Sequence, residues 1–170
     1  YPYTRRMNAN ARVDMGAGLL LCSLETARDA GVPEEKIVYI HAGTEAHDSH
    51  FLSTRENFHR SPGMRIAGGR VLQLADTSID QIDHFDLYSC FPSAVQVAAN
   101  ELGIPQDRAL TVTGGLTFGG GPLNSYGLHA VARMTEVLRE HPGQLGLVSS
   151  NGGWLAKHAF GIYSTRPPAN

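Results

Sequence analysis

The sequence predicts an α/β domain in which helices cover a five-stranded mixed sheet. Short apolar runs of strand length alternate with longer segments of helical periodicity. Alternation of this kind is typical of helices that cover a largely parallel sheet. The last two strand-like runs are separated only by a turn region at Gly152-Gly153, so they predict an antiparallel hairpin. We therefore expect the sheet to be mixed.

Five runs of apolar and β-branched residues are the predicted strands. They cover residues 18–22, 37–42, 85–88, 145–149 and 159–163. The first run is continuously apolar, which is typical of a buried strand.

Four segments are predicted helices because they carry local start and stop signals. Residues 25–30 form a short helix that Gly31 ends. Ser61 is a predicted N-cap with Pro62 in the first turn, and helical spacing continues to residue 75. A third helix ends at Gly103. The last long helix has an apolar face formed by Leu128, Val131, Thr135 and Leu138. The glycine-rich stretch 111–121 is not expected to be a regular helix.

Composition narrows the class of protein. The chain has 170 residues, of which 42% are hydrophobic and 18% charged, which suits one domain with a full core. A net charge of -2 gives no sign of binding to nucleic acid or an anionic membrane. Cys22 and Cys90 are the only cysteines, so we expect a reducing, cytoplasmic location. No apolar run approaches the length of a membrane span.

The ends of the chain resemble the ends of an excised domain. Residues 1–4 lack an initiator methionine and have the composition of a loop. We expect residues 1–165 to form the domain and residues 166–170 to begin a linker or tail.

Tyr88-Ser89-Cys90-Phe91-Pro92 is the first segment with candidate chemistry. A predicted strand runs into a helix here, where α/β proteins commonly build their sites. A helix N-terminus lowers the pKa of a nearby thiol, which favours reactivity of Cys90. A lone cysteine is, however, more often a buried apolar filler.

Residues 113–122 form a glycine-rich loop, which is the second such segment. So many glycines indicate positive φ angles or close approach to a ligand. The next helix is expected to begin near Asn124 or Ser125, where its amides can face an anion or an enolate oxygen. The loop matches neither a P-loop nor a dinucleotide fingerprint. The alternative is a tight crossover loop.

Residues 149–154 are the third segment. A strand end followed by paired glycines can direct backbone amides and the Asn151 side chain at a bound carbonyl, as in an oxyanion hole. An ordinary hairpin turn is an equal alternative. His41, His47 and His50 lie near Asp48 in the sequence, but their spacing favours a solvated loop, and we expect no metal site.

In their order along the chain, these motifs resemble the C-terminal domain of thiolases. Residues 88–91 stand where thiolases have Asn-Glu-Ala-Phe and where sterol-carrier-type thiolases have His-Asp-Cys-Phe. Residues 114–127 resemble the run Gly-Gly-(five residues)-His-Pro-Leu-Gly-Ala-Ser-Gly. Residues 151–153 fall where thiolases have their second catalytic cysteine and its glycines, and residues 13–18 resemble the start of the domain. Proteins with this pattern are usually labelled acetyl-CoA acetyltransferases.

The resemblance implies a half of a thiolase-like acyltransferase, with a coenzyme A thioester as substrate and no permanently bound cofactor. Its glycine-rich and oxyanion-hole loops would complete a site shared with an N-terminal half, so the isolated chain is not expected to be active. The implied catalytic residues are Tyr88, Cys90 and Asn151. The implied substrate-binding residues are Gly119, Gly120, Gly121, Gly152 and Gly153. Other implied partners are an OB-fold domain and, for the full-length protein, a second copy in a homo-oligomer. The implied role is in lipid metabolism.

Three positions depart from the thiolase pattern. Gly121 replaces the histidine that activates the nucleophilic cysteine, Asn151 replaces the second cysteine, and Tyr88 replaces an asparagine or histidine. The usual thiolase route to a carbon–carbon bond is therefore closed to these residues. Thiolase-related aldolases also carry a tyrosine at this motif, so one alternative is a retro-aldolase with Tyr88 as acid/base, provided that neighbours lower the phenol pKa. Another alternative is a non-catalytic acyl-CoA-binding protein.

Overall fold

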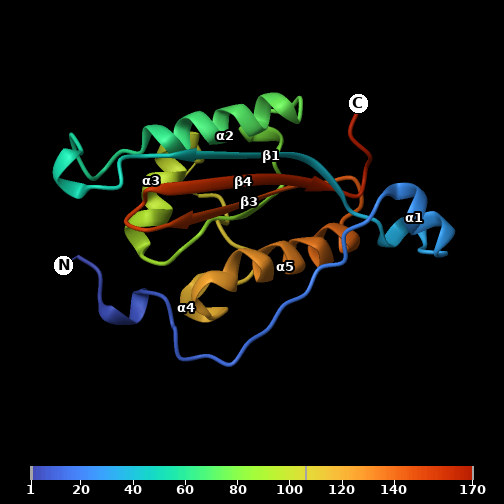
Figure 1. Ribbon diagram of the computed structural model, residues 1–170, viewed down its shortest axis with the longest axis horizontal. Coiled ribbons are helices and arrows are strands. Elements are labelled where there is room, and N and C mark those ends of the chain that lie inside the picture. The colour runs from blue at the N-terminus through green and yellow to red at the C-terminus, as the bar shows by residue number, and fades with distance from the viewer. Residues whose placement is uncertain (1, 106, 170) are drawn as a thin grey trace.

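A four-stranded sheet with helices on both faces forms the centre of the computed structural model, which describes residues 2–105 and 107–169 (Figure 1). The strands are β1 (Tyr39–His47), β2 (His84–Asp86), β3 (Leu145–Gly152) and β4 (Lys157–Ser164). Their order in the sheet is β1-β4-β3-β2. The α/β class predicted from the sequence is confirmed, but the sheet has four strands and not five.

The sheet is mixed, as predicted. β2 pairs with β3 in parallel, whereas β4 pairs antiparallel with both β3 and β1. The final hairpin, β3–β4, is confirmed. The expectation of a largely parallel sheet is wrong because β4 lies between β1 and β3 and runs against both.

The predicted strand at residues 18–22 does not form. This segment pairs with none of the described strands, and the side chains of Leu20 and Leu21 are 93% and 72% exposed. A strand needs a hydrogen-bonded neighbour, which apolar composition alone does not provide. The prediction for this segment is therefore wrong in the described chain.

The helices begin and end near the predicted signals. They are α1 (Leu24–Asp29), α2 (Pro62–Leu74), α3 (Pro92–Leu102), α4 (Gly115–Phe118) and α5 (Tyr126–Glu140). Short 3-10 turns cover Arg5–Met7, Glu34–Lys36, Leu52–Thr54, Ile79–Gln81 and Leu123–Ser125. The Ser61 hydroxyl caps α2 by accepting from Met64 N. The glycine-rich stretch holds a single helical turn, α4, which ends at Gly119 because the chain is too glycine-rich to extend it.

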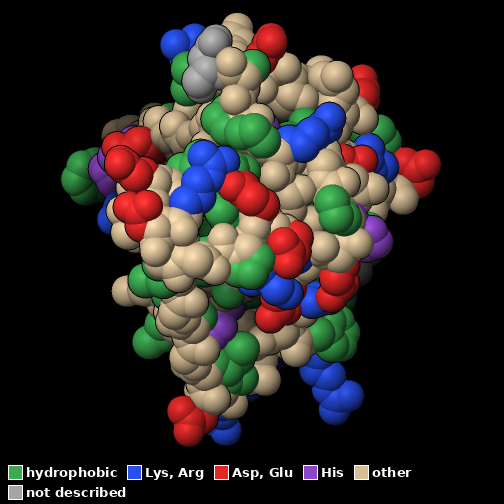
Figure 2. Space-filling view, turned by 90° about the vertical axis from the view of Figure 1, so that its right-hand side faces the viewer, with side chains coloured by type: hydrophobic (Ala, Val, Ile, Leu, Met, Phe, Trp, Pro, Cys, Tyr) green, Lys and Arg blue, Asp and Glu red, His purple; other side chains and the backbone are tan. Residues whose placement is uncertain are grey.

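Two apolar layers hold the helices to the sheet. α2 and α3 pack on one face, where Val71 of α2 meets Phe85 and Ile162 of the sheet, and α5 packs on the other face (Figure 1). Met134 and Val148 belong to the second layer. Alternate residues of a strand point to opposite faces, which explains why β4 serves both layers. At the α1 end of the molecule, Figure 2 shows hydrophobic side chains scattered among charged ones.

The Asp86 carboxylate is a buried hydrogen-bond centre at the end of β2. Asp86 is 0% exposed. Oδ2 accepts from the Thr111 hydroxyl (2.8 Å), Val112 N (3.0 Å) and Thr113 N (3.1 Å), and Oδ1 accepts from the Tyr126 hydroxyl (2.7 Å). A buried charge is tolerated only when it is satisfied in this way. One side chain thus joins β2, the start of the glycine-rich loop and the start of α5.

A second polar contact joins β4 to the N-terminus of α2. Nε2 of His158 lies 2.9 Å from Asp48 Oδ2 and 3.2 Å from Ser61 Oγ. Burial lowers the pKa of His158 below its ordinary value, against the opposing effect of Asp48. Burial acts to raise the pKa of Asp48, but hydrogen bonds from Ser61, Gly63 and His158 outweigh it, so that the pKa is lowered. The folded protein therefore favours a neutral histidine beside a charged aspartate.

Asp86→Asn is expected to destabilise the fold strongly. The amide would offer fewer acceptor sites to the donors of residues 111–113, so we expect a loss of about 3 kcal/mol or more in the free energy of unfolding. Tyr126→Phe removes one hydroxyl from the same centre and should cost about 1–2 kcal/mol. Urea unfolding followed by circular dichroism measures both. Equal losses in the two variants would contradict the central role of the carboxylate.

The stability of the protein should depend on pH through His158. Its pKa is lowered on folding, so protonation favours the unfolded chain. The stabilisation is complete above the unfolded pKa of about 6.5 and declines as the pH falls below it. Asp48 acts separately, because its lowered pKa preserves its contribution until the pH falls below about 4.

The matched variant for this measurement is His158→Gln, whose amide can still donate to Asp48 but does not titrate. Between about pH 7.5 and 5.5, the urea midpoint of the wild type should fall more steeply than that of the variant. The other histidines are common to both proteins, so their effects cancel in the comparison. Parallel pH profiles would show that His158 contributes no linkage.

Candidate functional site

The first and third predicted segments meet beyond the carboxyl ends of β2 and β3. These two strands are parallel neighbours, so the residues that follow them lie at the same edge of the sheet. There Cys90 Sγ donates to Asn151 Oδ1 at 3.6 Å, and Tyr88 N donates to the Ser149 hydroxyl at 3.0 Å. The structure therefore brings together the side chains of Cys90 and Asn151, which are 61 residues apart in the sequence.

Ser89 joins the glycine-rich loop to this edge. Its hydroxyl accepts from Leu116 N at 2.9 Å, in the first turn of α4. Gly115 has a φ angle of +71°, and a Cβ atom there would lie 2.6 Å from Ser89 Oγ. Glycine is thus required at residue 115 both for its backbone conformation and for this close approach.

Gly119, Gly120 and Gly121 approach the chain itself. A Cβ atom on Gly119 would lie 2.7 Å from Thr113 O, and one on Gly120 would lie 2.4 Å from Met15 Sδ. Gly121 N donates to Asn10 O at 2.9 Å. Part of the glycine content therefore serves packing against residues 9–15, a segment that the sequence analysis did not associate with the site.

Residues 7–10 are hydrogen-bonded both to Cys90 and to α4. Ala9 N donates to Cys90 O at 3.0 Å, and Asn10 N donates to Leu116 O at 2.9 Å. The Thr117 hydroxyl donates to Met7 O at 2.9 Å. No periodic pattern or turn motif marks this segment in the sequence, because its contacts are made through backbone groups.

An apolar pocket opens beside Cys90. It has a volume of about 370 Å³, within the range of small-molecule sites. Gly153 contributes to it from the turn of the β3–β4 hairpin, with a φ angle of +61°. Its lining is mainly apolar and comes from the loop after β1, the start of α3 and the hairpin turn: Leu52, Arg55, Phe58, Cys90, Phe91, Ser93, Ala94, Gly153, Trp154 and Leu155. The sequence analysis missed the contribution of residues 52–58, which carry no motif.

Tyr88 is half-buried, two residues before Cys90. Its ring meets the ring of Tyr126 edge-on, with 5.4 Å between centroids. Burial raises the pKa of Tyr88, and the proximity of Cys90 raises it further. This direction is the opposite of the lowering that an acid/base role in a retro-aldol reaction needs. At neutral pH the phenol is therefore protonated and can donate a hydrogen bond.

Cys90 is a protonated thiol in this environment. Burial raises its pKa, and the backbone N–H groups at the start of α3 offset only part of that effect. The helix N-terminus thus lowers the thiol pKa as expected, but burial outweighs this effect. Because Asn151 Oδ1 accepts the thiol hydrogen, the NH₂ group of the same amide is available as a donor to a ligand.

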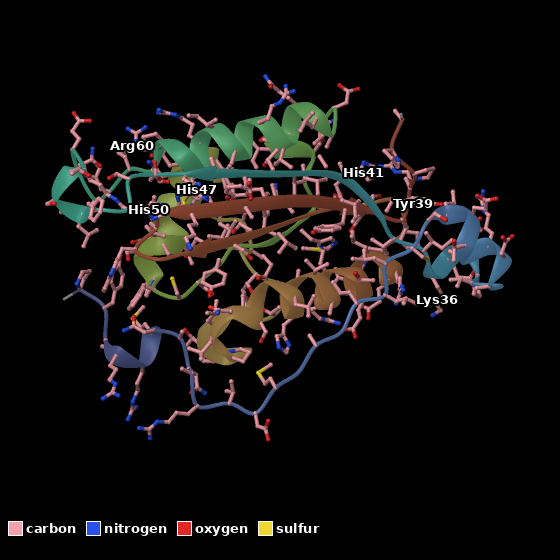
Figure 3. The ribbon with its side chains drawn as sticks, in the orientation of Figure 1. Lys36, Tyr39, His41, His47, His50 and Arg60 are labelled. Atoms are coloured by element: carbon pink, nitrogen blue, oxygen red, sulfur yellow. The ribbon has the colours of Figure 1, made fainter. Side chains whose placement is uncertain are left out.

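The histidines of β1 are far apart. His41 lies toward one end of β1, and His47 and His50 lie at the other end near Arg60 (Figure 3). His41 Nε2 contacts Arg166 O at 2.8 Å, and the rings of His47 and His50 are 5.9 Å apart. Within residues 2–105 and 107–169, no three His, Cys, Asp or Glu side chains are grouped to hold a metal ion. None of the helices described is both long and apolar enough to cross a bilayer.

Comparison with known proteins points to one family, although no protein-family model matches the chain. An acetyl-CoA acetyltransferase of Methanocaldococcus jannaschii is 25% identical over 99 residues, which is 58% of this chain. The peroxisomal 3-ketoacyl-CoA thiolase B of Candida tropicalis is 30% identical over 87 residues, or 51% of the chain. A monomeric SCP2-thiolase like protein type 1 from Mycobacterium smegmatis matches 85% of the chain with a TM-score of 0.81 and 41% identity.

The matches cover only part of those proteins. The chain spans 25% and 21% of the two curated relatives and 33% of the solved structure. The Candida protein and the solved structure carry thiolase names, and the Methanocaldococcus protein is an acetyl-CoA acetyltransferase. The chain is a thiolase-like domain.

Proposed function

We propose that this domain supplies one wall of an acyl-CoA thioester site in an acyltransferase of thiolase type. An N-terminal half outside this chain would form the other wall. The observation that carries the proposal is the apolar pocket that opens at Cys90, beside the amide of Asn151. Such a pocket suits an acyl chain, and the Asn151 amide, which contacts the lining residue Cys90, suits a thioester oxygen held there.

The Asn151 amide is the main polarising group in this proposal. Its oxygen is occupied by the Cys90 thiol, so its NH₂ group is held in an orientation from which it can donate to a thioester oxygen. Donors fixed before reaction stabilise the charge that develops on that oxygen in the transition state. Cys90 is then a positioning residue, because it acts through Asn151.

Proton transfer and nucleophilic attack would come from elsewhere. Burial keeps the Cys90 thiol and the Tyr88 phenol protonated at neutral pH, so neither is an activated nucleophile or base. Gly121 has no side chain to activate a nucleophile. We therefore propose that the nucleophile belongs to the N-terminal half, with this domain polarising the thioester.

The assembly of the whole protein is part of the proposal. The solved relative is described as monomeric, which gives no support to a homo-oligomer. We propose that the N-terminal half is the principal partner of this domain, and that acyl-CoA is its ligand.

Asn151→Ala in the whole protein that carries this chain should lower kcat for acyl transfer by about 10²-fold, the usual cost of one oxyanion-hole donor. KM should change far less, because the donor acts mainly on transition-state charge. Cys90→Ala keeps the Asn151 amide but removes the thiol that orients it, so this variant should lower kcat less. Initial rates with acetyl-CoA and a longer acyl-CoA measure both effects.

Lys157→Gln is the control, since Lys157 is an exposed residue of the same hairpin. Its rates should match the wild type. Tight binding of acyl-CoA with no turnover in the wild-type protein would favour the non-catalytic alternative. Equal rates for Asn151→Ala and the wild type would contradict the proposed role of the amide.

A further inference from the structure

Arg55 lies between two walls of the apolar pocket and is held by both. Its Nε and Nη2 donate to Ser49 O at 2.9 and 2.7 Å, and its Nη1 donates to Trp154 O at 2.5 Å. Ser49 belongs to the loop after β1, and Trp154 belongs to the turn of the β3–β4 hairpin. The guanidinium is therefore fixed in position before any ligand binds.

The positive charge of Arg55 has no partner of opposite sign in the described part of the protein. Its three acceptor contacts are with neutral carbonyl groups, and two of its five N–H groups remain. Within the described chain, no carboxylate lies within 4.0 Å of Arg55. Asp48, which is close in sequence, is committed to Ser61, Gly63 and His158.

Arg60 provides the contrast on the same loop. Its Nε lies 2.6 Å from Glu101 Oε1, so its charge is balanced. Arg60 lines a neighbouring polar cavity of about 500 Å³ and is not part of the apolar pocket. Arg55 lines both cavities, and it is the charged side chain of the apolar pocket.

The shape of the Arg55 guanidinium favours one kind of anion. Leu52, Phe58 and Trp154 line the pocket beside it and are 41%, 66% and 68% exposed, so the pocket is open to an incoming ligand. The planar guanidinium also matches the geometry of a carboxylate better than a lysine would. An anionic group in this pocket is expected to form charge-assisted hydrogen bonds with the two remaining N–H groups.

We propose that Arg55 makes the pocket selective for acyl groups that carry a terminal carboxylate, as in monothioesters of dicarboxylic acids. This inference rests on the proposed function, in which the thioester lies at Cys90 and Asn151. Cys90 and Arg55 line the same pocket, so the tail of an acyl group held at Cys90 extends along apolar walls toward Arg55. A phosphate of coenzyme A offers similar chemistry, and the experiment must separate the two.

Pantetheine thioesters separate them, because they contain no phosphate. The whole protein would be titrated with pantetheine thioesters of dicarboxylic acids and of monocarboxylic acids of matched chain length. Calorimetry measures binding, and the fluorescence of Trp154, which lines the pocket, is a second readout. We expect the dicarboxylic compounds to bind about tenfold more tightly at the best chain length, as charge-assisted hydrogen bonds allow.

Arg55→Gln should abolish this preference, and Arg55→Lys should reduce it. Arg60→Gln, which removes a balanced charge outside the pocket, should retain it. Circular dichroism checks the folding of each variant, and the wild-type preference is informative even if a variant fails to fold.

Equal binding of the two acid classes by the wild type would overturn the inference and leave acyl-CoA binding intact. An Arg55-dependent preference for coenzyme A over pantetheine, without a preference for dicarboxylic acids, would assign Arg55 to a phosphate and also overturn it. Failure of every thioester to bind would instead contradict the proposed function on which the inference rests.

Discussion

The buried carboxylate of Asp86 is the constraint on which the site depends. It lies at the end of β2, where the chain leaves the sheet toward Tyr88 and Cys90. Burying a charge is costly unless hydrogen bonds replace its water. The replacement donors come from residues 111–113 and from Tyr126, so satisfying the charge also fixes the glycine-rich loop and α5. Cys90 follows only four residues later, so its position is set by the same network.

The contact between His158 and Asp48 is a second polar contact that bears on the site. Asn151 and His158 are paired in the β3–β4 hairpin, so the bond from Asp48 to His158 anchors the strand beside Asn151. Arg55 adds a second tie between the loop after β1 and the hairpin turn. These contacts bring the apolar residues of that loop over the start of α3, where the pocket forms. The site is thus a product of long-range polar contacts around a small sheet.

Local signals in the sequence predicted the bounds of the helices better than the strands and pairing of the sheet. Ser61-Pro62 and Gly103 act within one helical turn of their own chain, which is why α2 and α3 were predicted well. Residues 18–22 have the composition of a strand, but pairing depends on a distant neighbour that composition does not reveal. Likewise, no pattern marks Arg55 or the backbone contacts of residues 7–10. The sequence placed the motif segments where α/β sheets build their sites, and the structure adds that Cys90 and Asn151 meet because the parallel strands β2 and β3 end at one edge. The directions of the Tyr88 and Cys90 pKa shifts depend on burial, which only the structure gives.

The chemical character of the site follows from the charges it lacks. Cys90 and Tyr88 are held neutral by burial, and Asn151 cannot titrate. Neutral donors polarise a carbonyl without exchanging protons, so these residues are suited to stabilising charge that develops on a bound ligand. Against this neutral background, the fixed cation of Arg55 is the proposed determinant of which acyl group the pocket selects. Reactivity and selectivity would then reside in different residues, with reactivity completed by the other half of the protein and selectivity set within this domain.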